Sequence, residues 1–156
     1  MTLRGWAARG GVPMKTVRDL LQTKGDTIAS VTPETSVIEA LELMARWDIG
    51  ALVVLEGDSL CGLISERDYA RKVILKGKRS TETLVREIMS TEVVCVSPAQ
   101  RVGPCMALMT EKRVRHLPVL EEGRLVGIIS IGDVVKAIID DQLFTIEQLE
   151  HYITGH

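Results

Sequence analysis

The chain has 156 residues, of which 46% are hydrophobic and 26% charged, and its formal net charge is -2. This composition is typical of a globular protein and excludes a disordered tail. The near balance of charge and an aromatic content of only 3% give no basis for nucleic-acid binding. No apolar run approaches the ~18 residues that a membrane-spanning helix requires, so we expect no membrane partner.

Three cysteines, Cys61, Cys95 and Cys105, form no CxxC pair and are odd in number. Because they lie within apolar patterns, we predict three buried free thiols and a cytoplasmic location. Residues 1–14 lack the apolar region of a secretory signal. We expect them to form an N-terminal extension that precedes the domain proper.

The first half of the chain predicts helices alternating with strands. The expected helices span residues 15–23, 37–47 and 66–76, and the expected strands span residues 27–31, 50–55 and 60–65. Ser36, with Glu39 three residues later, predicts a capping box at the start of the second helix. That helix is expected to bury one stripe of side chains, which runs from Val37 through Met44 to Trp47.

The same pattern restarts after a polar linker at residues 78–84. The segment GLISERD at 62–68 returns as GIISIGD at 127–133, at a constant offset (127 − 62 = 65). The second copy predicts strands at residues 93–96, 116–120 and 125–130 and a closing helix at 133–139. Its first helix carries Gly103 and Pro104 in the opening turn, so we expect that helix to begin late or loosely.

These elements predict an α/β (α+β) fold made of two tandem β-α-β-β-α repeats. We delimit an extension at 1–14, repeat 1 at 15–77, a linker at 78–84, repeat 2 at 85–141 and a C-terminal helical tail at 142–156, which Thr145 can open. One repeat of about 60 residues buries too little apolar surface to be secure alone. We therefore expect a pseudo-two-fold relation between the repeats, with sites in symmetric pairs.

A serine followed by an aspartate three residues later marks the strand-to-helix junction of each repeat, as Ser65 with Asp68 and Ser130 with Asp133. The simplest interpretation is a helix cap. Two observations favour a ligand: both copies use Asp, which closes a capping box less well than Glu or Gln, and cationic residues lie nearby. A carboxylate can accept hydrogen bonds from a ribose diol, while helix-end N–H groups with Arg or Lys can hold phosphate.

The two motifs, each preceded by Val-Thr-Pro at 31–33 or Val-Ser-Pro at 96–98, resemble those of a tandem cystathionine-β-synthase (CBS) domain pair, or Bateman module. The resemblance covers residues 15–141, and SERDYARK at 65–72 with MTEKRVRHLP at 109–118 is similar to stand-alone bacterial CBS-pair signalling proteins, some related to the regulatory segment of IMP dehydrogenase. It implies a regulatory sensor that binds adenosine-containing ligands between its repeats (AMP, ADP, ATP, NAD(H) or, less readily, S-adenosylmethionine). It also implies a homodimer, and a regulated enzyme as partner.

By position, the resemblance implies that Asp68 and Asp133 bind the ribose hydroxyls. The other implied ligand-binding residues are Ser65 and Ser130 beside the carboxylates, Thr32, Val96 and Ser97 near the base or ribose, Ile49, Gly50, Ala51, Val114, Arg115, His116 and Pro118 along the pockets, and Arg67, Arg71 and Lys72, with Arg115 and His116, as phosphate ligands. Gly50 and Ala51 stand where the second repeat has Arg115 and His116. We therefore expect the two pockets to differ in affinity.

Two other functions stay open. An enzyme is disfavoured because no HExxH, GxSxG, Walker A or GxGxxG motif occurs, and His116 has no second metal ligand nearby. We accordingly expect no catalytic residue and no metal requirement. The second alternative is a ligand-free scaffold that binds partners, in which the Ser-x-x-Asp motifs only cap helices.

Overall fold

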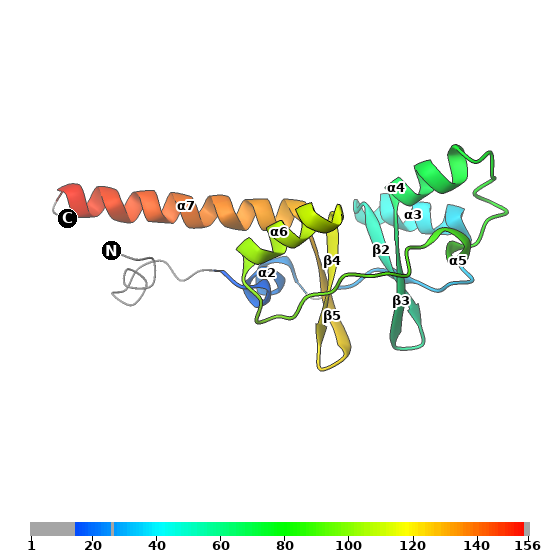
Figure 1. Cartoon of the computed structure of the whole chain (residues 1–156), viewed down its shortest axis with the longest axis horizontal. Coiled ribbons are helices and arrows are strands. Elements are labelled where there is room, and N and C mark those ends of the chain that lie inside the picture. The colour runs from blue at the N-terminus through cyan, green and yellow to red at the C-terminus, as the bar shows by residue number, and fades with distance from the viewer. Residues whose placement is uncertain (1–14, 26, 155–156) are drawn as a thin grey trace. The chain divides into compact units, whose positions relative to one another are not determined.

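The computed structural model describes residues 15–25 and 27–154, and the predicted extension at 1–14 lies outside them (Figure 1). The helices are α2 (Val17–Lys24), α3 (Val37–Trp47), α4 (Glu66–Tyr69), the π-helical η1 (Ala70–Ile74), α5 (Val85–Ile88), α6 (Val102–Lys112) and α7 (Ile131–Thr154). The strands are β1 (Ser30–Val31), β2 (Ala51–Glu56), β3 (Ser59–Ser65), β4 (His116–Glu121) and β5 (Arg124–Ser130). This mixture of helices and strands confirms the predicted fold class.

The strands form two sheets. In the first, β2 pairs with β1 in parallel and with β3 in antiparallel orientation, while the second contains β4 and β5. The predicted strand at 93–96 is wrong, because the described residues there form only an isolated bridge at Val96. Since its counterpart β1 has only two residues, the loss of one ladder pair is enough to remove the strand.

The chain folds into two compact units that do not follow the sequence repeats. The described part of unit 1 comprises residues 15–25, 96–116 and 129–154, and that of unit 2 comprises 27–95 and 117–128. The helix that precedes repeat 1, α2, therefore belongs to the unit that contains α6 and α7. Helix α5, which precedes the strands of repeat 2, belongs to the unit that contains α3.

Backbone hydrogen bonds explain the composition of unit 1. The N–H of Val17 donates to the carbonyl of Gln100 at 2.8 Å, and the N–H of Val102 donates to the carbonyl of Lys15 at 3.1 Å. Each helix start thus supplies an acceptor for an N–H group of the other helix start, and that N–H group has no acceptor within its own helix.

Unit 2 repeats this pairing with the linker and α5. The N–H of Val85 donates to the carbonyl of Thr35, and the N–H of Val37 donates to the carbonyl of Thr83, both at 2.8 Å. Thr83 is buried at 3% exposure, and its hydroxyl donates to the Arg79 carbonyl at 2.7 Å. The end of the polar linker is therefore packed into unit 2, although most of its residues are exposed.

Helix α6 begins at Val102, the position equivalent to Val37 (102 − 37 = 65), so the expectation of a late start is wrong. Pro104 falls within the first turn, where a backbone N–H has no partner inside the helix and its loss costs little. The side chain of Arg101, at the N-cap, makes no capping hydrogen bond to the helix. The Lys15 carbonyl takes over part of that role.

Helix α3 confirms one half of the predicted capping box, since the Ser36 hydroxyl accepts a hydrogen bond from the Glu39 N–H at 3.3 Å. Val37 and Met44 are buried as predicted. Trp47 is 50% exposed, which contradicts the predicted stripe. It is the last residue of α3, followed by Asp48 in the left-handed conformation, and it lies beyond the buried cluster of unit 2.

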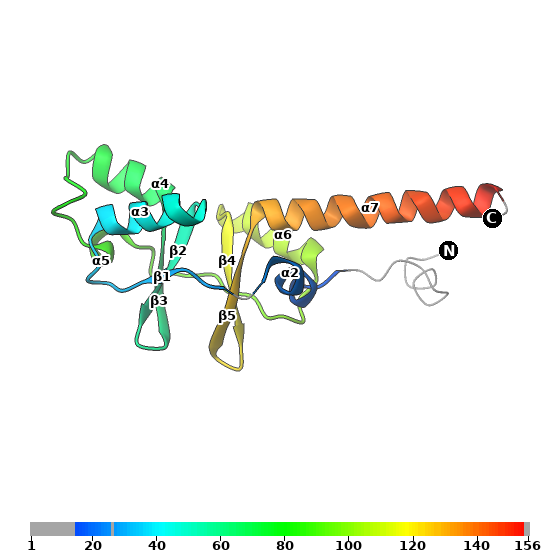
Figure 2. The same cartoon turned by 180° about the vertical axis from the view of Figure 1, so that it is seen from behind.

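The closing helix and the tail form one element, α7, which Figures 1 and 2 show as a continuous helix. The prediction that Thr145 opens a separate helix is wrong, because its hydroxyl donates to the Asp141 carbonyl one turn earlier, at 2.9 Å. Among the described residues, no helix is long and apolar enough to cross a membrane.

Replacing Gly62 by Ala is expected to lower the free energy of unfolding by about 1–3 kcal/mol. A Cβ at Gly62 would lie 2.7 Å from Met89 Sδ and 3.1 Å from the Ser90 carbonyl oxygen, which already accepts a hydrogen bond from Leu63. Gly103→Ala is the matched control, because a Cβ there meets nothing within 4 Å. Urea unfolding should show a loss only for Gly62→Ala, and equal stability of the two variants would contradict this packing.

Candidate functional site

The motif of unit 2 is a closed capping box. Asp68 Oδ2 accepts hydrogen bonds from the Ser65 N–H at 2.9 Å and from the Ser65 hydroxyl at 3.1 Å. The Asp68 N–H donates to Ser65 Oγ at 3.2 Å in return. The argument that Asp closes this box poorly is therefore wrong, and capping by itself explains the residue type.

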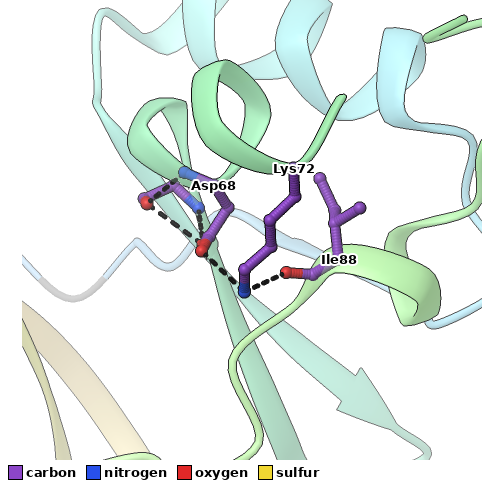
Figure 3. Close-up of polar contacts among 4 residues, drawn as sticks. Asp68, Lys72 and Ile88 are labelled. Atoms are coloured by element: carbon purple, nitrogen blue, oxygen red, sulfur yellow. Dashed lines mark hydrogen bonds and ion pairs between the residues drawn. The ribbon is translucent and has the colours of Figure 1, made fainter. Parts of the chain in front are cut away.

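Lys72 occupies the other oxygen of Asp68. Its ammonium lies 3.2 Å from Asp68 Oδ1 and donates to the Ile88 carbonyl at 2.9 Å, as Figure 3 shows. The Asp68 side chain is only 14% exposed. A ligand at this carboxylate has to share or displace Lys72.

The motif of unit 1 has the same cap but a different cation. Asp133 Oδ2 accepts from the Ser130 N–H at 2.8 Å, and the Asp133 N–H donates to Ser130 Oγ at 3.2 Å. Lys24, at the end of α2, places its ammonium 2.7 Å from the same Oδ2 atom. The position equivalent to Lys72 is Ala137 (72 + 65 = 137), which is buried.

Sequence reasoning missed Lys24, which is 109 residues away from its partner. The one available signal was Ala137, which stands where the first motif has Lys72, the residue four positions after its aspartate.

The charges around Asp133 shift two pKa values. Partial burial raises the pKa of the Asp133 carboxyl, but the Lys24 ammonium and the Ser130 N–H and hydroxyl groups outweigh it, and the net pKa lies below the ordinary value. Burial lowers the pKa of His116, Lys24 and Arg115 lower it further, and Asp133 opposes them. At neutral pH, Asp133 is therefore a carboxylate and His116 is uncharged.

Most N–H groups at the two helix starts already have acceptors inside the protein. Besides the cap bonds, the Glu66 N–H donates to the Gly50 carbonyl at 3.1 Å, and the Ile131 N–H donates to the Arg115 carbonyl at 2.8 Å. Three of the first four N–H donors of each helix are thus occupied. The expectation that these helix ends are open to phosphate is wrong for those three donors.

A third box of the same kind stands at the start of α2, where Asp19 Oδ2 accepts from the Thr16 N–H at 2.9 Å and from its hydroxyl at 3.1 Å. The Asp19 N–H donates back to Thr16 Oγ1 at 3.4 Å. No ligand is predicted at this exposed position. Capping geometry alone therefore does not identify a ligand site.

The predicted ligand residues divide between the two units. Unit 2 contains Thr32, Ile49, Gly50, Ala51, Ser65, Arg67, Asp68, Arg71, Lys72 and Pro118, and unit 1 contains Val96, Ser97, Val114, Arg115, His116, Ser130 and Asp133. The carbonyls of Gly50 and Arg115 join the pocket segments to the two motifs. The Thr32 hydroxyl is engaged with that of Thr35 at 3.2 Å.

Of the three free cysteines, only Cys105 is fully buried, while Cys61 and Cys95 are half-buried. The prediction of three buried thiols is therefore wrong for Cys61 and Cys95. Burial raises the pKa of each thiol, which disfavours the reactive thiolate. Within the described ranges, no group of His, Cys, Asp and Glu side chains is placed to hold a metal ion.

Replacing Lys24 by Met is expected to raise the pKa of both Asp133 and His116, because the ammonium favours the carboxylate and disfavours the imidazolium. NMR titration of both side chains measures the effect, with Lys112→Met as a control in the same unit. The Lys24 variant should lose about 0.5–1 kcal/mol of stability at neutral pH. The difference should vanish as the pH falls through the pKa of folded Asp133, which sits below its value in the unfolded chain. Unchanged pKa values would contradict the pairing.

Comparison with known proteins shows the family. The CBS domain profile matches residues 16–74 and 85–140. The chain is 36% identical over 154 residues to the CBS domain-containing protein CBSX3, mitochondrial, of Arabidopsis thaliana, which covers 93% of this chain and 75% of that protein. It is also 32% identical over 111 residues to the inosine-5′-monophosphate dehydrogenase of Methanocaldococcus jannaschii, which covers 70% of this chain and 21% of that enzyme.

Solved structures of similar proteins point to the same family. A protein with CBS domains from Burkholderia ambifaria MC40-6, named for signal transduction, is 51% identical with a TM-score of 0.79, covering 82% of this chain and 96% of that one. The CBS domain pair of protein MJ0100, solved with 5′-methylthioadenosine and S-adenosyl-L-methionine, shares the fold at 23% identity and a TM-score of 0.72, covering 81% and 97%. The chain therefore belongs to the CBS-domain family, as a tandem CBS pair of the regulatory, signal-transducing kind.

Proposed function

We propose that this chain is a non-catalytic sensor of adenosine-containing nucleotides, which bind at the Ser-x-x-Asp motifs in the cleft between the CBS repeats. Membership of the CBS family supports this function, and the adenosyl ligands named for the MJ0100 domain pair support the ligand class. The observation that carries the proposal is the surroundings of Asp133. An ionised carboxylate pairs there with Lys24 and lies near His116, and His116 in turn lies near Arg115.

Asp133 suits a ribose diol. The Ser130 N–H and the Lys24 ammonium both contact its Oδ2 atom, and a carboxylate can accept a ribose hydroxyl at its other oxygen. Its lowered pKa keeps the carboxylate ionised, and hydrogen bonds to a charged acceptor are stronger than those between neutral groups. The side chain is 27% exposed, which leaves it accessible.

The cations around Asp133 favour a ligand that carries phosphate. Lys24 and Arg115 carry positive charge, and a phosphate beside His116 would favour its protonated form. AMP, ADP, ATP and NAD(H) fit this charge, whereas the cationic sulfonium of S-adenosylmethionine fits it less well. Asp68 differs, because both its oxygens are engaged and its neighbours Gly50 and Ala51 are uncharged. We therefore infer that the Asp133 site binds phosphorylated adenosine more tightly than the Asp68 site.

A scaffold without ligand is the second candidate function. The closed boxes at both motifs favour it, together with the same box at Thr16 and Asp19, where no ligand is proposed. On either reading we retain the predictions of a cytoplasmic homodimer and of a regulated enzyme as partner, without a metal requirement.

Asp133→Ala is expected to weaken AMP binding at least about tenfold, because a ribose diol loses hydrogen bonds to a charged acceptor. Calorimetry measures the affinity, and thermal shift with ATP, NADH and S-adenosylmethionine ranks the ligands. Asp19→Ala is the matched control, because it removes an equivalent cap at about 1 kcal/mol of stability and should leave affinity unchanged. If wild-type protein binds none of these ligands, the scaffold is the correct function.

A sensor has to bind its ligand with different affinity in two arrangements of its parts. Saturating AMP is therefore expected to change the small-angle scattering profile of the full chain. Asp133→Ala at the same AMP concentration provides a control with lower occupancy, in which the change should be smaller. Superimposable profiles from fully bound and free wild-type protein would argue against signalling by conformational or dimer change.

A further inference from the structure

Helix α7 uses one face for packing within unit 1. Val134 and Ala137 on this face are buried, and α2 and α6 both contact the helix. Further along, the Lys15 ammonium lies 3.5 Å from Asp140, and the Lys15 N–H donates to Asp141 at 3.5 Å. Figures 1 and 2 show α7 continuing past α2 and α6, with no other described element of unit 1 beside its C-terminal half.

A second apolar stripe runs along a different face of α7. Its exposed members are Ile139 (51%), Leu143 (59%), Ile146 (52%), Leu149 (47%) and Ile153 (80%). The three isoleucines are seven residues apart, with Val135, Gln142 and Leu149 each four residues before one of them. This is the heptad spacing of a coiled coil, and from Val135 to Ile153 it extends over nearly three heptads.

We propose that α7 pairs in antiparallel orientation with α7 of a second copy of this chain, across a two-fold axis near residue 144. In this register Ile139 lies opposite Leu149 of the partner subunit, and Ile146 lies opposite Gln142 of the partner subunit. Both copies contribute the same surface, and each contact occurs twice across the axis, as a two-fold interface requires. Pairing therefore removes the apolar stripes of both helices from contact with water.

Charge complementarity selects the antiparallel orientation. Lys136 and Glu150 flank the stripe on the same edge, and neither forms an ion pair with another described residue. Antiparallel pairing brings each Lys136 opposite Glu150 of the partner subunit, twice across the axis. Parallel pairing would instead place like charges at the same level.

Gln142 sets the strength and register of this contact. It is the polar residue within the stripe, and a polar residue in a coiled-coil layer lowers stability while it disfavours shifted registers. The pairing is therefore reversible, and an apolar residue at position 142 should strengthen it.

Sedimentation equilibrium of the full chain tests the surface. Ile146→Asp is expected to halve the mass of the wild-type assembly, because a charge enters the centre of the stripe, whereas Glu147→Lys on a neighbouring face should leave it unchanged. Gln142→Leu should tighten association about tenfold. A monomeric wild type, or an Ile146→Asp protein of unchanged mass, would overturn the proposal. The AMP affinity of Ile146→Asp is measured in parallel. This measurement distinguishes a failure of the pairing proposal from a failure of the proposed ligand site.

Charge reversal tests the orientation. Lys136→Glu and Glu150→Lys are each expected to weaken association about threefold to tenfold. An equimolar mixture of the two variants should regain wild-type association, because both pairs across the axis are then opposite in charge. A mixture that associates no better than either variant alone would overturn the antiparallel register.

Discussion

The backbone pairing between each short helix and a distant loop is the constraint on which the rest of the structure depends. Residues 15–18 bond to the loop at 98–102, and residues 83–86 bond to the loop at 33–37. Each pairing satisfies N–H groups at a helix start that would otherwise be buried without an acceptor. A single sequence repeat therefore cannot complete its own fold, and each unit takes chain from both repeats.

This exchange also decides the electrostatics of the candidate site. Because α2 belongs to unit 1, Lys24 reaches Asp133, while the equivalent carboxylate, Asp68, takes its cation from Lys72 one turn along its own helix. The two motifs thus share a capping geometry but differ in how their cations are held. One cation depends on the tertiary fold, and the other is local. This difference is the physical basis on which we propose that the two motifs differ in ligand affinity.

Capping and ligand binding are compatible roles for one carboxylate, since its two oxygens can serve different donors. The box at Thr16 and Asp19 shows that the cap needs only local sequence. What distinguishes Asp133 is its partial burial, its shifted pKa and the positive charges around it. The capping motif alone is therefore insufficient to identify a ligand site, and the proposal for Asp133 depends on its surroundings.

The repeats, most of the helices and strands and both motifs could be predicted from the sequence, because each rests on local periodicity or on a fixed spacing. Only the tertiary structure decided the exchange of α2 and α5 between units, the contact of Lys24 with Asp133 and the exposure of Trp47. It also decided that Val96 forms a single bridge and that α7 continues through Thr145. These features depend on which distant segments supply acceptors, partners and covering side chains, and local sequence patterns do not encode that choice.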